Sequence, residues 1–451
     1  MNAQNLKYKR IFFPAVIGVI AFCVAVSFSS VFTAPVLKDS KQFDELGWNL
    51  ARGKGFVDGN MQPTMIREPV YPYFLSLIYR LSGHSHKAVT IVQALLFSGV
   101  AVLTFFLAKD VFGSNIAKIS SLAVAVFPTL ADYTVYILSE VFFTFCLLAL
   151  ILVLTKSLKY ASYAGIFASG IILAILALTK AVMLLFIVFA IGGFFIYNLG
   201  KKKFLKKFLL MSLIFTFAFA LLVCPWIARN KRFFGVHSIT TRAGKALYNR
   251  SVKLDYGWAE WKKILTFSVS EFLGKKVYPD EVSPEKVLLL EDHMAEAKMS
   301  RLIDRGLTPQ QADSVLIEES IDKIKKRPLR YLGQSALESV KLLGFTHIRS
   351  LNEEDALKWF SKFKNGKITL SVTRGIFRML AYLIMFFCVG GILISLKSWR
   401  RWMVMFLAML YIGAVYSLTF SWARYTVPLL PCYLIFAAVF AERIFFNHEA
   451  A

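Results

Sequence analysis

The sequence predicts an all-α integral membrane protein that crosses the bilayer about ten times. Of its 451 residues, 57% are hydrophobic, a share well above that of soluble domains. These residues gather in blocks of about 20, the length that a helix needs to span a bilayer. The loops between several blocks are short and rich in Lys and Arg, which is typical of loops that stay in the cytoplasm.

The apolar blocks define the predicted spans. The first block is longer than the core of a cleavable signal peptide, about 7–15 residues, and lacks a small-residue cleavage motif, so we expect it to remain as a helix. In chain order, the predicted spans are 11–34, 86–108, 116–131, 136–155, 160–178, 181–198, 206–228, 373–396, 401–420 and 426–446.

Three short basic loops orient the chain in the membrane. Residues 156–160, 200–207 and 397–401 carry Lys and Arg but no acidic residue. The positive-inside rule assigns these loops to the cytoplasm, and with them both termini. Residues 35–85 and 229–335 then lie on the extracytoplasmic side.

Three regions follow from this arrangement: residues 1–228 with seven spans, a polar outer region at 229–335 between the seventh and eighth spans, and residues 336–451 with the last three spans. The polar region holds 20 Lys/Arg and 14 Asp/Glu, a mixture typical of a folded subdomain.

Cytoplasmic loops explain most of the net charge of +25, so we expect no nucleic-acid partner. The five cysteines have no CxxC spacing, and they predict neither a disulfide framework nor a zinc site.

The first outer loop, 35–85, is more than a connector. Its stretch "SKQFDELGWNLARG" has apolar residues on one helical face and ends at Gly, which predicts an amphipathic helix on the bilayer surface. Residues 68–79, "EPVYPYFLSLIY", predict a second short interfacial helix. Asp39 stands where the first of these helices begins, and on spacing alone it is a candidate N-cap.

Glu140 is an unusual acid near the start of a span. Between Asp110 and Asp255 the chain has only one other acidic residue, Asp132. Because a carboxylate in the bilayer core is costly, an acid in a span indicates a function unless it reaches the headgroups. Two interpretations stay open: a hydrogen-bonded glutamate at the interface, and a polar group that faces a cavity.

Several short motifs follow one another along the chain: "DSKQFDELGWNLARGKGF" with "REPVYPYFLSLIYRLSG", then "FPTLADYTVYILSEVFFTF", "LALTKAVMLLF", "CPWIARNKRFFG", "IKKRPLRYL" and "ARYTVPLLP". In this order they resemble the GT-C glycosyltransferases, and most closely glycosyltransferase family 39, which holds the protein O-mannosyltransferases and bacterial enzymes of the lipid A aminoarabinose transferase type. The chain departs from the family at Lys180 and Ala181, where Arg and Pro are usual.

The resemblance implies a polytopic GT-C fold and an enzyme that moves a sugar from a polyprenyl-phosphate donor to an acceptor hydroxyl, with inversion. Asp39 aligns with the catalytic acid of the family's first loop, so its implied role is general base. Asp44 and Glu45 are alternates, and otherwise solvated acids near a helix start. Glu140 matches the second acidic motif, where it would orient a substrate or bind a divalent ion.

A phosphate leaving group needs cations, and Arg offers two parallel donors. The candidates are Arg67 and Arg229 first, then Lys180 and Arg424, all expected at the outer membrane face. His84 and His86 lack the i,i+4 spacing of a helical metal pair, and we expect them to be interfacial residues. We therefore predict no metal site. The resemblance implies that no cofactor is required, because the family's transferases of this type mostly do not depend strictly on a metal, although a divalent cation stays open.

The implied partners are a polyprenyl-phosphate-linked sugar, the bilayer, and a glycan, lipid or protein acceptor. The implied location is a bacterial inner membrane, with the active site on the extracytoplasmic face and the region 229–335 capping it or binding the acceptor. Two rival functions stay open. A transporter or flippase of lipid-linked saccharides is disfavoured because the polar groups lie at one face, not at the midplane. A non-catalytic glycan-assembly subunit is disfavoured by the presence of both Asp39 and Glu140.

Overall fold

Helices make up the computed structural model, which describes residues 3–32, 34, 36, 38–280, 284–343 and 366–445. Within this part of the chain no strand forms, and the nearest approach to one is a single bridge between Val57 and Pro63. The predicted all-α membrane fold is confirmed.

Eight helices of the described chain are long and apolar enough to cross a bilayer. The fourth, seventh and eighth of them begin with short 3-10 turns. Their helical segments are α1 (Ala3–Val31), α4 (His86–Phe112), α7 (Glu140–Tyr160), η1 (Ala181–Leu185) with α9 (Phe186–Asn198), α10 (Phe204–Phe234), α18 (Gly366–Ile394), η4 (Leu396–Ser398) with α19 (Trp399–Leu418), and η5 (Ala423–Leu429) with α20 (Leu430–Phe445).

Two predicted spans are shorter than expected. The block 116–131 divides into α5 (Ser114–Val126) and α6 (Pro128–Tyr133), because Pro128 cannot continue α5 and instead starts a new helix. The block 160–178 forms the 15-residue helix α8 (Tyr163–Ala177). The count of ten crossings therefore stays a prediction.

Glycines allow two pairs of spans to touch. A Cβ on Gly170 of α8 would lie 2.5 Å from the backbone oxygen of Phe215 in α10. One on Gly391 of α18 would lie 1.9 Å from the backbone oxygen of Phe436 in α20. Inside a bilayer, helices associate through close packing, and small residues permit it. These contacts fix how α8 meets α10 and how α18 meets α20.

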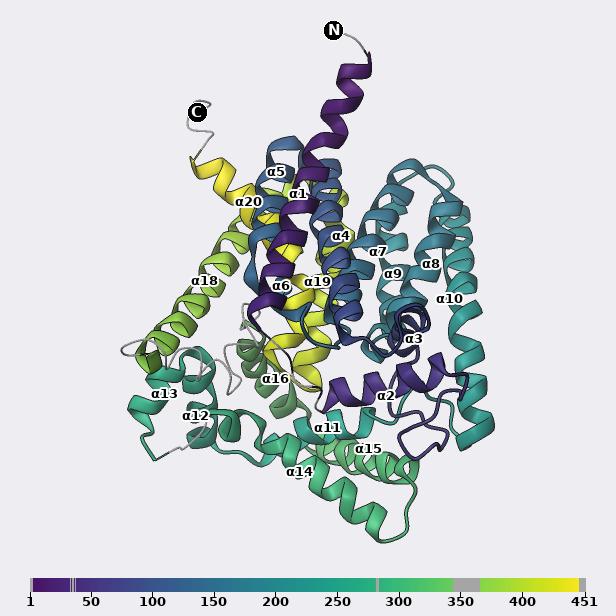
Figure 1. Ribbon diagram of the computed structural model, residues 1–451, viewed down its shortest axis with the longest axis vertical. Coiled ribbons are helices and arrows are strands. Elements are labelled where there is room, and N and C mark those ends of the chain that lie inside the picture. The colour runs from purple at the N-terminus through teal and green to yellow at the C-terminus, as the bar shows by residue number, and fades with distance from the viewer. Residues whose placement is uncertain are drawn as a thin grey trace.

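The two predicted interfacial helices are present as α2 (Asp39–Ala51) and α3 (Val70–Ser82). Figure 1 shows α2 lying across one end of the bundle of spans. The two helices cross at Gly47, where an added Cβ would lie 2.7 Å from Cβ of Leu75. Gly53, whose φ is 74°, follows the end of α2 and turns the chain back.

The polar region also folds into helices. Figure 1 shows this region at the end of the molecule opposite to the start of α1 and the end of α20, with α11, α14 and α15 beyond α2 and with α12 and α13 near the start of α18. A capping box at Thr308 and Gln311 starts α15. The helices of the region are α11 (Ala243–Val252), η2 (Lys253–Asp255), α12 (Trp258–Val269), α13 (Glu271–Val277), α14 (Pro284–Asp304), α15 (Pro309–Lys326) and α16 (Pro328–Leu342).

Buried charges join η2 to α16. Lys253 donates a hydrogen bond to Oε1 of Glu338, and Nζ of Lys341 lies 3.6 Å from Oε2 of the same carboxylate. All three side chains are buried. Next to them, the hydroxyl of Thr426 in η5 donates to the backbone oxygen of Leu342 at 2.7 Å. The polar region is thus attached to the start of the last span.

Glu338 makes the stability of this attachment depend on pH. Burial raises the pKa of Glu338, but Lys341 and Lys253 outweigh it and bring the pKa to about 2, below the 4.5 of an unperturbed group. Because the folded-state pKa is depressed, the ionised Glu338 carboxylate stabilises the fold above pH 4.5. This stabilisation, in total about 3 kcal/mol, is lost as the pH falls toward 2.

We expect Glu338→Gln to lower the unfolding temperature of the solubilised protein at pH 7, and the difference from wild type to shrink below pH 4. A difference that does not change with pH would contradict this assignment.

Candidate active site

Asp39 begins α2 as its first helical residue and not as its N-cap. The residue before it, Lys38, has a φ of 51°, and no side chain caps the helix. The Asp39 carboxylate instead accepts a hydrogen bond from Arg67 on Oδ1 and one from Nη2 of Arg424 on Oδ2, the latter at 2.6 Å. The N-cap interpretation is therefore wrong. An N-cap carboxylate would accept hydrogen bonds from backbone amides in the first turn of α2, whereas this one accepts them from two guanidinium groups.

The Asp39 carboxylate is a charged group among cations. Burial would raise its pKa, but Arg424, Arg67 and Arg242 together hold the pKa of Asp39 well below its usual range. Burial and the charge of Arg242 lower the pKa of Arg67 to about 10. At neutral pH Asp39 is thus ionised and both of its oxygens are engaged.

Neighbouring side chains orient the two guanidinium groups. Nε of Arg67 donates to Oε1 of Gln42 at 2.7 Å, and its Cζ lies 4.7 Å from the ring centroid of Phe43. Cζ of Arg424 lies 5.3 Å from the ring centroid of Tyr425. Hydrogen bonds and ring faces therefore fix both cations before any ligand arrives.

Glu140 and Lys180 form a second pair beside the first. Nζ of Lys180 lies 3.3 Å from Oε1 of Glu140, and the side chains are only 13% and 4% exposed. Oε2 of Glu140 is buried and finds no hydrogen-bond partner among the described residues. The Lys180 Nζ also lies 5.8 Å from the ring of Tyr425, which Arg424 contacts as well, so the two cations share this aromatic neighbour. Of the two interpretations of Glu140, its burial against a cation favours the polar group of a site.

Glu68 connects the two pairs through the backbone. Its Oε1 accepts a hydrogen bond from the backbone amide of Ala181 at 3.0 Å, and the amide of Val70 donates to the backbone oxygen of Leu178 at 3.0 Å. These two hydrogen bonds join the segment around Arg67 to the segment around Lys180. The sequence interpretation missed Glu68, although it lies inside the quoted "REP" motif.

Gln42 and Arg242 were missed as well. Gln42 is three residues from Asp39, so it could have been found from the helix that both share. Arg242 comes from the polar region, where Thr240 and Thr241 hydrogen-bond the backbone oxygens of Ile66 and Met65, and no local pattern points to it.

Arg229 lies away from the charged cluster. Its guanidinium donates to the backbone oxygens of Thr64 at 2.8 Å and Phe56 at 3.2 Å, and to Oδ1 of Asn230 at 2.8 Å. Among the described contacts, none joins Arg229 to Asp39. Arg229 instead lines a cavity of about 550 Å³ whose other walls include Phe56, Pro69, Tyr73, Leu178 and Trp226.

The two alternate acids of α2 differ from each other. Glu45 is 37% exposed and lies 3.8 Å from Lys41. The prediction that Asp44 is solvated is wrong, because the turn between α3 and α4 folds over it and leaves the residue 7% exposed. Its carboxylate contacts Tyr79, His84 and His86, and neither acid contacts Arg67 or Arg424 among the described interactions.

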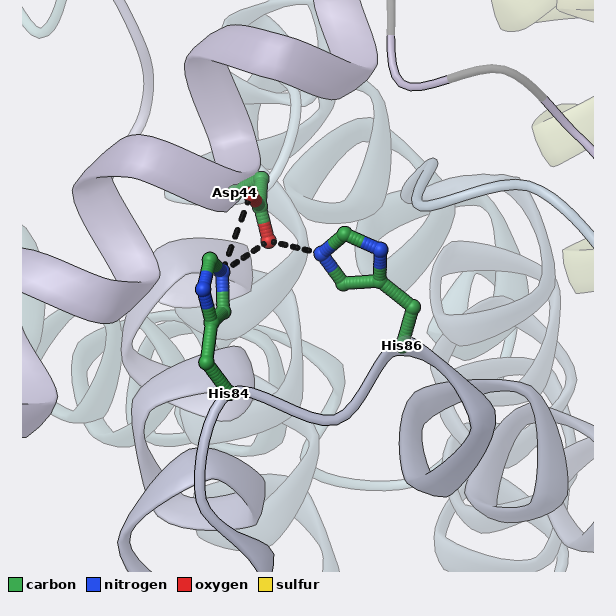
Figure 2. Close-up of side chains that lie close together, drawn as sticks. All are labelled: Asp44, His84 and His86. Carbon is green, nitrogen blue, oxygen red and sulfur yellow. Dashed lines mark hydrogen bonds and ion pairs between the residues drawn. The ribbon is translucent and has the colours of Figure 1, made fainter.

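The histidines are not independent interfacial residues. They stand on either side of Ser85, the N-cap of α4, so they belong to a turn and not to one helix face. Figure 2 shows both imidazole rings directed at the Asp44 carboxylate. The i,i+4 spacing expected of a helical metal pair does not apply to His84 and His86, because they do not lie on one helix.

One family profile matches part of the sequence. Residues 62–228 match the profile of the family described as dolichyl-phosphate-mannose-protein mannosyltransferase. The match includes Arg67, Glu140 and Lys180 and ends before the polar region. No curated protein sequence matches the chain significantly.

Oligosaccharyltransferases of known structure share the fold. The apo oligosaccharyltransferase of Archaeoglobus fulgidus gives a TM-score of 0.56 at 14% identity over 98% of this chain and 51% of that one. The same organism's oligosaccharyltransferase AglB, in complex with an inhibitory peptide and a dolichol-phosphate, gives 0.53 at 12% identity over 97% and 51%. ArnT from Cupriavidus metallidurans bound to undecaprenyl phosphate gives 0.41 at 14% identity over 96% and 78%.

This chain spans about half the length of the oligosaccharyltransferase chains that it matches. The predicted resemblance to the GT-C glycosyltransferases is confirmed, by the family profile over 62–228 and by the fold over nearly the whole chain.

Proposed function

We propose that this protein is a membrane glycosyltransferase that moves a sugar from a polyprenyl-phosphate donor to an acceptor hydroxyl, with inversion at the sugar carbon. The observation that carries the proposal is the Asp39 carboxylate held between Arg67 and Arg424, beside the buried pair of Glu140 and Lys180. AglB binds a dolichol-phosphate and a peptide, which supports a donor and acceptor of these general classes.

The donor phosphate binds Arg67 and Arg424. Both guanidinium groups are buried or nearly so, at 4% and 20% side-chain exposure, and both already bind an anion. Arg binds phosphate and carboxylate through the same pair of N–H donors. A donor phosphate is therefore an alternative partner for the cations that hold Asp39, and Lys180 adds a third positive charge nearby.

This exchange of partners turns Asp39 into a base. While two guanidinium groups hold it, its depressed pKa makes it a poor proton acceptor. When phosphate withdraws one or both cations, the pKa of Asp39 rises and an oxygen becomes free. Asp39 then takes the proton of the acceptor hydroxyl, whose oxygen forms the new bond to the sugar carbon. The bond between that carbon and the phosphate oxygen breaks, and its electron pair leaves with the polyprenyl phosphate.

Glu140 orients the sugar or the acceptor. Its Oε1 is held by Lys180, while the buried Oε2 is free to accept a hydrogen bond from a hydroxyl. The reaction as written needs no metal ion or other cofactor, since Arg67, Arg424 and Lys180 supply the charge that stabilises the leaving group.

The cavity beside Arg229 takes the first part of the lipid. Pro69 and Leu178, which line it, lie two residues from Arg67 and Lys180 along the chain. Its aromatic and aliphatic walls suit an isoprenoid chain better than a sugar. The active site would face the extracytoplasmic side of a bacterial inner membrane, with both termini in the cytoplasm, as the basic loops predict.

The test uses a deletion strain of the native host. We expect it to accumulate one polyprenyl-phosphate sugar and to lack the same sugar on one envelope glycan, lipid or protein, both measured by mass spectrometry. A detergent extract of its membranes is then incubated with the purified full-length protein. A transferase adds the sugar to the acceptor and releases polyprenyl phosphate in this extract.

A transporter or flippase changes nothing in the extract, because detergent has removed the bilayer across which it would act. A non-catalytic subunit also changes nothing when added alone. Either result would refute the proposal, and so would a deletion strain whose lipid-linked sugars are unchanged.

A further inference from the structure

We propose that Asp44, His84 and His86 bind one divalent transition-metal ion, with Zn²⁺ as the best fit. Nε2 of His84 lies 2.9 and 3.0 Å from the two oxygens of Asp44, and Nε2 of His86 lies 3.1 Å from Oδ1. One ligand atom from each residue lies within 4.8 Å of the other two. Figure 2 shows both rings pointing these nitrogens at the same carboxylate.

The spacing suits tetrahedral coordination. With metal–ligand bonds of about 2.0–2.2 Å, the ligand atoms of a tetrahedral zinc site lie about 3.3 Å apart. The nitrogen–oxygen distances here are within a few tenths of an ångström of that value. Two imidazole nitrogens and one carboxylate oxygen favour zinc and its neighbours over Mg²⁺ and Ca²⁺, which prefer oxygen ligands.

Neighbouring side chains hold two of the three ligands in place. The ring of His84 stacks on that of Trp48, with centroids 4.8 Å apart and planes 3° from parallel. The hydroxyl of Tyr79 donates a hydrogen bond to Asp44. A hydrogen-bonded carboxylate and an oriented imidazole are what metal sites commonly use.

The cluster is open to solvent on the histidine side. The side chains of His84 and His86 are 36% and 45% exposed, while that of Asp44 is 10% exposed. A metal ion can therefore enter from solution, and water can complete its coordination.

This site is separate from the one around Asp39. Five residues along α2 amount to about 7.5 Å along the axis and about 140° around it, so Asp44 and Asp39 face different directions. The ion would join α2 to the turn between α3 and α4. It would fix the position of α2, the helix that carries Asp39, and would take no part in the reaction.

Metal content and affinity test the site. Full-length protein, purified through a tag without histidine, is stripped with a chelator and then titrated with Zn²⁺ in competition with a chromophoric chelator. We expect one tightly bound ion per chain in wild type. The variant His84→Gln/His86→Gln should bind at least about 100-fold more weakly. The matched control, His237→Gln/His293→Gln, changes two exposed histidines elsewhere and should bind as wild type does.

Two further measurements guard against misinterpretation. Asp44→Asn keeps an acceptor for Tyr79 but loses the anionic ligand, so it should weaken Zn²⁺ binding while the unfolding temperature of the metal-free protein stays near that of wild type. Mg²⁺ at the same concentrations should not displace Zn²⁺. Wild type that holds no ion, or a double variant that holds one as tightly as wild type, would overturn the proposal and leave a hydrogen-bonded histidine cluster.

Discussion

Asp39→Asn is expected to lower the rate of sugar transfer at least about 10³-fold and to leave donor binding as tight as in wild type or tighter. The rate falls because an amide cannot take the proton of the acceptor hydroxyl, and general base catalysis contributes about 10²–10⁴. Donor binding holds because Arg67 and Arg424 lose their competing anion. The purified protein shows this as a fall in kcat with an unchanged or lower KM for the donor.

The matched comparison is Glu45→Gln, which removes an exposed acid from the same helix. It should leave both constants near the wild-type values. If Asp39→Asn transfers normally and Glu45→Gln or Asp44→Asn does not, the base is one of the alternate acids. If Asp39→Asn loses donor binding as well as rate, Asp39 is needed to position the arginines and not to accept a proton.

The second large effect concerns Glu140 and Lys180. Glu140 is buried and the Lys180 side chain is only 13% exposed, so Glu140→Gln or Lys180→Met leaves its partner as an uncompensated charge, at a cost of about 3–5 kcal/mol in known buried pairs. We expect each single variant to lower the unfolding temperature strongly and to reduce transfer more than about 100-fold. The double variant should recover much of the stability but not the activity, because the charges are also needed for the substrate.

The control pair for this cycle is Lys159 with Asp110. Their charged atoms are 2.8 Å apart, but Lys159 is 48% exposed, so removing its charge should change stability by less than about 1 kcal/mol. Additive losses in the double variant of Glu140 and Lys180 would show that the two residues do not interact energetically, whatever their distance.

The local pattern of residues was sufficient to predict the helices, but it was not sufficient to predict the contacts within the candidate site. The apolar face of α2 and the aromatic run of α3 predict two short interfacial helices, and both are present, because amphipathic periodicity is a property of neighbouring residues. The joining of Asp39 to Arg424 connects residues 385 positions apart, and no periodicity reaches that far. The family resemblance named both residues but gave no sign that they form an ion pair.

The errors have a common physical origin. Asp39 was a candidate N-cap, Asp44 a candidate solvated acid, and His84 and His86 candidate interfacial side chains, each on the basis of residues within one turn of the chain. In every case a distant segment supplies the decisive contact: Arg67 and Arg424 for Asp39, and the turn before α4 for Asp44. Local rules fail where tertiary partners compete with local ones.

The pairing of Asp39 with Arg424 also orders events during biosynthesis. At about 5–20 residues per second, roughly 20–80 s pass between synthesis of the first outer loop and synthesis of the last span, since 385 positions separate the two residues. For that interval the nascent chain carries Asp39 and Arg67 but lacks one of the two arginines proposed to hold the donor. On the proposed function, a ribosome-bound or prematurely terminated chain would therefore not consume lipid-linked sugar, and the donor would be used only by proteins whose insertion is complete.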